Sequence, residues 1–86
     1  MPIISRFYGI DIQMFYNDHA PPHFHATYGD DELVVQINPI MIMEGDVRPR
    51  VRSMVLEWAA LHQAELLTNW QRCRSGQAPA PIDPLS

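Results

Sequence analysis

Three of the four histidines, His19, His23 and His25, fall within seven positions of the 86-residue chain. Two consecutive prolines precede His23 and stiffen the backbone into an extended loop. The alternation that begins at His23 predicts a strand, in which successive side chains point to opposite faces. His23 and His25 would share one face, while Phe24 and Ala26 pack on the core from the other. We therefore expect any chemistry of this chain on the imidazole face.

Acid–base catalysis is one chemistry that these residue types permit. Two imidazoles beside a cation suit metal-free phosphodiester cleavage. This reaction needs a base, an acid and a cation that stabilises the negative charge of the phosphorane. The candidate catalytic residues are His23, His25 and Arg6. Further candidates for contacting a ligand are Asp18, His19, Tyr28 and His62.

Metal binding is an alternative use of the same histidines. The spacing H-x-x-x-H-x-H puts His23 and His25 on one strand face, where they can chelate a metal, and His19 from the loop can close a third position. Further ligands would come from Asp18, Glu44 or His62. A structural interpretation is that the histidines hydrogen-bond one another, Gln36 or the backbone. We expect no cofactor, with a divalent metal as the alternative.

Composition limits the classes of function. The net charge of −4 argues against generic binding to a nucleic-acid backbone, which depends on an excess of Lys and Arg. No apolar run approaches the ~18 residues of a membrane helix, and nothing at the N-terminus resembles a secretory signal. The single cysteine, Cys73, has no internal disulfide partner, and we expect it to be a buried, inert thiol. A cytoplasmic protein with no membrane association is the expectation.

Alternating apolar residues predict the strands that would position the histidines, at residues 3–7, 10–16, 23–28, 32–37 and 40–43. A hairpin loop of two residues at 29–30, or of four at 29–32, puts Phe24 and Ala26 on the apolar face of the return strand. A loop of three residues would invert every side chain and is rejected. The apolar run at residues 40–43 would expose two large side chains on a single-faced sheet, which favours a partner surface or burial on both faces.

Helical spacing predicts segments at residues 49–61 and 63–74, with a kink or break near residue 62 because their apolar stripes differ in direction. The predicted fold is therefore α+β, an antiparallel meander of four to five strands packed against this C-terminal helix. Residues 1–76 would form a single domain, and the Pro-rich tail at 77–86 would be extended with little to bury. The predicted core is Ile10, Ile12, Met14, Phe24, Ala26, Val35, Ile37, Val55 and Trp58.

Three segments carry a family resemblance: PIISRFYGI at residues 2–10, NDHAPPHFHATYG at residues 17–29 and LEWAALHQAELLTNW at residues 56–70. With them the chain resembles, over residues 2–76, the bacterial family catalogued as domain of unknown function 4160. The resemblance implies a small partner protein and, in some pairs, the toxin role of a type II toxin–antitoxin module. It supplies no established catalytic residues.

Three functional hypotheses follow from these observations. The first is a toxin whose imidazole face binds or cleaves RNA and whose partner is an antitoxin. The second is a non-enzymatic protein-binding module, in which strand 40–43 contacts a partner or a second copy of the chain. The third is a metal-binding domain built on His19, His23 and His25.

Overall fold

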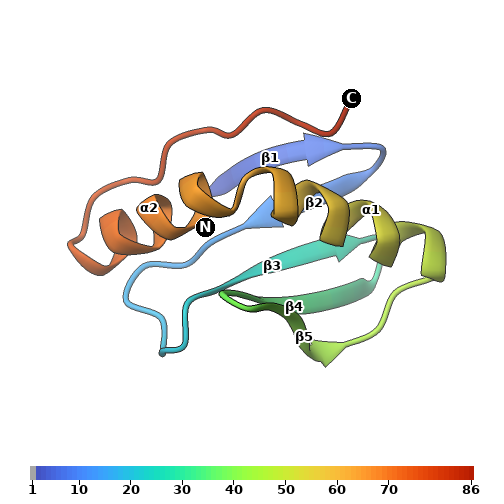
Figure 1. The fold of residues 1–86 in the computed structure, drawn as a ribbon, viewed down its shortest axis with the longest axis horizontal. Helices are drawn as coiled ribbons and strands as arrows, with labels where there is room; N and C mark the ends of the chain where they lie inside the picture. Colours follow the sequence, from blue (N-terminus) through green and yellow to red (C-terminus); the bar gives the residue numbers. More distant parts are fainter. Residues whose placement is uncertain (1) are drawn as a thin grey trace.

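The computed structural model of this chain describes residues 2–86. Over these residues a run of strands is followed by two helices (Figure 1), which confirms the α+β prediction. The strands are β1 (Ile3–Phe7), β2 (Ile10–Gln13), β3 (His23–Tyr28), β4 (Asp31–Ile37) and β5 (Ile40–Gly45). The helices are α1 (Pro49–Leu61) and α2 (Gln63–Arg74).

The strands form one antiparallel sheet in the order β1-β2-β3-β4-β5, which is the predicted meander. Two-residue loops join β1 to β2 at residues 8–9, β3 to β4 at residues 29–30, and β4 to β5 at residues 38–39. Tyr8 and Gly9 have φ values of 51° and 82°. Positive φ at both positions matches the right-handed twist of the flanking strands, and it explains the glycine in this turn.

The register of β3 on β4 separates the two faces of the sheet. Phe24 lies opposite Val35, and His25 lies opposite Val34, so the histidines alternate with the core residues Phe24 and Ala26 along β3, as predicted. Both helices cover the apolar face (Figure 1). Trp58 of α1 is fully buried there, with its ring 5.7 Å from that of Phe24. All the predicted core residues are buried: Ile10, Ile12, Met14, Phe24, Ala26, Val35, Ile37, Val55 and Trp58.

The two helices are separated at His62, where φ is −121° and ψ is 23°. This confirms the predicted break. Trp58 and Leu66 are both fully buried, one in each helix, and His62 between them is only half-buried. The break thus lets each helix turn its own apolar stripe toward the core.

Strand β2 is shorter than predicted, because it ends at Gln13 rather than at residue 16. Met14 is still buried, and its N–H donates to the carbonyl of Pro2. Tyr16 is 45% exposed, and Asn17 has a φ of 53°. A continued strand would have put Met14 and Tyr16 on one face, but the chain leaves the sheet to begin the loop that carries Asp18.

The C-terminal tail corrects a second prediction, that residues 77–86 have little to bury. Ile82 is 4% exposed, and its N–H donates to the carbonyl of Ile4 at 2.8 Å, on the outer edge of β1. The Trp58 indole donates to the carbonyl of Asp83 at 2.8 Å. Asn69 both donates to and accepts from the backbone of Ala80. The tail is extended, as predicted, but it lies beside β1 as part of the core (Figure 1).

Strand β5 exposes two of its apolar residues, as the sequence predicted. Met41 is 51% exposed and Met43 is 40% exposed, whereas Ile40 and Ile42 pack against the core. In the described part of the chain no helix is long and apolar enough to cross a membrane.

Candidate functional site

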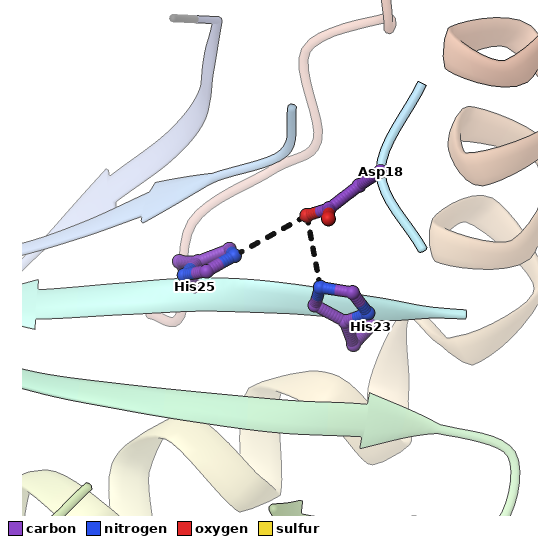
Figure 2. A group of neighbouring side chains, drawn as sticks. All are labelled: Asp18, His23 and His25. Atoms are coloured by element: carbon purple, nitrogen blue, oxygen red, sulfur yellow. Dashed lines mark hydrogen bonds and ion pairs between the residues drawn. The ribbon is translucent and has the colours of Figure 1, made fainter. Parts of the chain in front are cut away.

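The loop between β2 and β3 brings a carboxylate onto the two strand histidines. Figure 2 shows Asp18 above the start of β3, with both imidazoles turned toward it. The Oδ2 atom of Asp18 lies 2.9 Å from Nε2 of His23 and 3.5 Å from Nε2 of His25. The ligand atoms of all three residues lie within 4.8 Å of one another. We call these three residues the Asp–His–His cluster.

His23 is fixed by its surroundings on several sides. It is 8% exposed, and its ring lies 5.1 Å from that of Trp70 in α2. Its Nδ1 atom lies 2.8 Å from the carbonyl oxygen of Pro21. A carbonyl oxygen only accepts, so this nitrogen carries the proton and donates. The Nε2 atom lies 2.9 Å from Oδ2 of Asp18, so it donates to this carboxylate when the ring is protonated and offers a lone pair there when the ring is neutral.

His25 has the same arrangement with different partners. Its Nδ1 atom lies 3.3 Å from Oε2 of Glu32, and an ionised carboxylate only accepts, so Nδ1 again donates. The edge of the ring packs on Phe15, with 4.5 Å between centroids. Among the described residues, the buried Nε2 atom of His25 has no hydrogen-bond partner. Its lone pair points toward Asp18.

Asp18 is ionised in this setting. Burial of the carboxyl raises its pKa, but the His19 backbone N–H, the charge of His23 and the contacts of Oδ2 with both strand histidines lower it more. The net effect is a pKa below the ordinary value for aspartate. The His19 N–H donates to Oδ1 at 2.8 Å, which leaves Oδ2 for the histidines.

Two imidazole nitrogens and one carboxylate oxygen thus converge on the same small space. A proton on Nε2 of His23 can bridge it to Asp18, and a metal ion in place of that proton could bind all three atoms. Atoms that share one first-row metal at 2.0–2.2 Å are roughly 3.0–3.5 Å apart, and the two Asp18 contacts of 2.9 and 3.5 Å are close to these separations. Ligating histidines also usually donate their second ring N–H to a carbonyl or a carboxylate, as both histidines do here. The cluster therefore has the donor atoms and the supporting hydrogen bonds of a metal site.

His19 lies outside this cluster, although the sequence analysis included it as a ligand. Its side chain is exposed, and its contribution to the cluster is the backbone N–H to Asp18. The loop therefore contributes Asp18, and not His19, to the group that could hold a metal.

The other candidates lie elsewhere. Arg6 is on β1, separated from β3 by β2, and its Nε donates to Asp11 at 3.2 Å. Tyr28 is at the opposite end of β3 from His23, and the Arg48 guanidinium lies 5.2 Å from its ring centroid. His62 is at the break between the helices, with its Nδ1 2.6 Å from Oε1 of Glu65. The structure brings none of these three to the Asp–His–His cluster.

Sequence reasoning missed Glu32, the carboxylate that holds His25. The signal was present in the hairpin register, because Glu32 pairs with Thr27 and so shares a face with His25 one step along the sheet. The Pro21 carbonyl and the Trp70 ring had no such signal, since both depend on how the loop and α2 pack against the start of β3.

Comparison with known proteins gives the family. Neither the curated proteins nor the solved structures include a match to the chain. The family model described as "Domain of unknown function (DUF4160)" matches residues 9–71, which include the Asp–His–His cluster and most of both helices. The matched segment is well over half of the 86 residues, so the chain belongs to the DUF4160 family.

Proposed function

We propose that the Asp–His–His cluster binds one divalent first-row transition metal and that this centre is the functional site of the protein. The observation that carries the proposal is the convergence of three potential ligand atoms within 4.8 Å of one another. Both Nδ1 atoms face acceptors, so in neutral rings both Nε2 atoms would offer their lone pairs on the side of Asp18.

The donor set indicates the kind of metal. Two imidazoles and one carboxylate suit Zn²⁺, Fe²⁺, Mn²⁺ or Co²⁺, and three protein ligands leave coordination positions open for water or substrate. When bound, such an ion supplies Lewis-acid chemistry and lowers the pKa of bound water. The chain orients both rings through Pro21 and Glu32 before any ion arrives.

The direct test is Co²⁺ titration of untagged, chelator-treated protein, followed by visible absorption. We expect one ion per chain. Removing a ligand in Asp18→Ala, His23→Ala or His25→Ala should weaken binding by at least about 100-fold, because loss of a supporting hydrogen bond alone costs 10–100-fold.

His62→Ala is the matched control, since it also removes an imidazole that is hydrogen-bonded to a carboxylate, that of Glu65. It should bind Co²⁺ as wild type does, and so should His19→Ala. Equal affinity in His62→Ala and His23→Ala, or no binding by wild type, would refute the metal centre.

The toxin role remains a second proposal. Its support is the family resemblance together with a site that is partly open to solvent, since the His25 side chain is 17% exposed. In this role the chain acts on an RNA through the Asp–His–His cluster, and a small partner protein neutralises it. Induced expression should arrest bacterial growth for wild type and His62→Ala but not for His23→Ala. Arrest by all three at equal protein levels would remove the cluster from this role.

A protein-binding role without catalysis rests on Met41 and Met43, the exposed apolar residues of β5. If they contact a second copy, wild type should sediment as a dimer and Met41→Gln/Met43→Gln as a monomer. A monomeric wild type over the accessible concentration range would exclude this form of the proposal.

A further inference from the structure

A pocket of about 390 Å³ adjoins the Asp–His–His cluster. It is lined by residues 17–20 of the loop and by Arg74, the last residue of α2. Asp18 belongs to both the pocket lining and the Asp–His–His cluster, so the two sites meet at this residue. The volume is within the range of pockets that hold small molecules.

Arg74 is the positively charged residue of this pocket. Over residues 2–86 its exposed guanidinium forms no ion pair, whereas Arg6 and Arg52 are each paired with an aspartate. The exposed imidazole of His19 and the amide of Asn17 are further polar groups in the lining. A planar guanidinium donates two parallel hydrogen bonds to a carboxylate or a phosphate.

The Asp18 carboxylate repels an anionic ligand in this pocket less than a free carboxylate would. Its Oδ1 accepts the His19 N–H, and its Oδ2 faces the histidines. With a divalent ion on Oδ2 the ion and the carboxylate together carry one positive charge, which adds to that of Arg74. The pocket then presents positive charge from two sides.

We infer that this pocket binds a small molecule through an oxyanion, a phosphoryl or a carboxyl group, that is held by Arg74 beside the metal. The inference rests on the proposed metal centre and names the class of substrate for it. Arg74 is a binding residue in this scheme and not a metal ligand.

The test is a titration of Zn²⁺-loaded, isotope-labelled protein with methyl phosphate and, separately, with acetate, followed by NMR shifts of the amides and of the arginine Nε–H groups. We expect saturable shifts at residues 17–20 and at Arg74 for at least one probe. The tighter probe distinguishes a phosphoryl from a carboxyl ligand. Arg74→Ala should weaken that probe on the order of ten-fold, because it removes a charge-assisted pair.

Arg50→Ala is the matched control, since Arg50 is an exposed arginine in the first turn of α1 and its loss changes the net charge equally. Equal weakening in both variants, or shifts that map away from residues 17–20, would overturn the inference. Zinc stoichiometry is measured in the same samples. Protein that holds zinc but shows no shift dependent on Arg74 refutes this inference alone, whereas protein that holds no zinc refutes the metal centre on which it rests.

Discussion

The two faces of the sheet are built from opposite kinds of contact. On the helix face, Trp58 is fully buried against Phe24, and the tail closes the edge through Ile82. In the Asp–His–His cluster, two imidazoles and a carboxylate meet, with a hydrogen bond between His23 and Asp18. The first arrangement stabilises the fold by removing apolar surface from water. The second holds both imidazole rings in place through the Pro21 carbonyl and Glu32, which is the preorganisation that the proposed metal centre needs.

The largest expected effect is on the helix face. Trp58→Ala should lower the free energy of unfolding by about 3–5 kcal/mol, because the indole fills the core between β1, β3 and α1. That is a large share of the stability of a domain of this size. Urea unfolding followed by circular dichroism measures it.

Trp58→Phe is the companion variant. It keeps an aromatic ring in the core but loses the indole N–H that donates to Asp83. We expect it to lose clearly less stability than the alanine variant. A loss below about 1 kcal/mol for Trp58→Ala would mean that the helix face is not the main source of stability.

The tail supplies the next prediction. Ile82→Ala should cost about 2–4 kcal/mol, since Ile82 is 4% exposed and belongs to the core. Ser86→Ala, an exposed position in the same tail, should stay within about 0.5 kcal/mol of wild type. If the two substitutions cost the same, the tail does not contribute to the core in solution.

A third variant tests the polar face. Asp18→Asn in metal-free protein at neutral pH should lower the free energy of unfolding by about 0.5–1.5 kcal/mol. The lowered pKa of Asp18 means that the fold favours the ionised carboxylate, which accepts from the His19 N–H and faces His23. Asp30→Asn, in the turn between β3 and β4, is the control for the change in charge, and urea unfolding measures both. A more stable Asp18→Asn would show that the carboxylate faces unprotonated nitrogens, as expected of a site that needs a cation.

The smallest predicted effect concerns Cys73, a buried thiol on the helix face. Burial raises its pKa, and the nearby Arg72 charge offsets only part of that rise. A raised pKa contributes stability that is fully present below the ordinary thiol value of 9.0 and is lost as the pH rises toward the folded value. The free energy of unfolding should therefore fall between about pH 8 and about pH 10 more steeply in wild type than in Cys73→Ala. Equal pH dependence of the free energy of unfolding in the two proteins would mean that water reaches the Cys73 thiol and its pKa is not raised.

Much of the fold could be predicted because burial leaves a periodic trace in the sequence. The alternation in β3 and β4 fixed the faces of the hairpin, and the two apolar stripes located the break at His62. The tail left no such trace, since Ile82 is a single apolar residue among prolines. Its burial depends on Ile4 and Asn69, which are distant in sequence.

The site was predicted in part for the same reason. Strand geometry alone places His23 and His25 together, because they are two positions apart on one face. The contribution of Asp18 depends on the path of the loop after Gln13, where Asn17 takes a positive φ, and no periodicity encodes that path. Sequence reasoning therefore named both Asp18 and His19 without telling which one turns inward.

The attachment of the tail to β1 also has a consequence for the order in which the chain folds. Hairpins with two-residue loops close between near neighbours, whereas the bond from Ile82 to Ile4 joins nearly the two ends of the chain. Until it docks, the outer edge of β1 presents unpaired backbone groups that can pair with another newly made chain. Docking of the tail through Ile82 thus covers part of one edge of the sheet, whereas β5 remains the open edge on the other side.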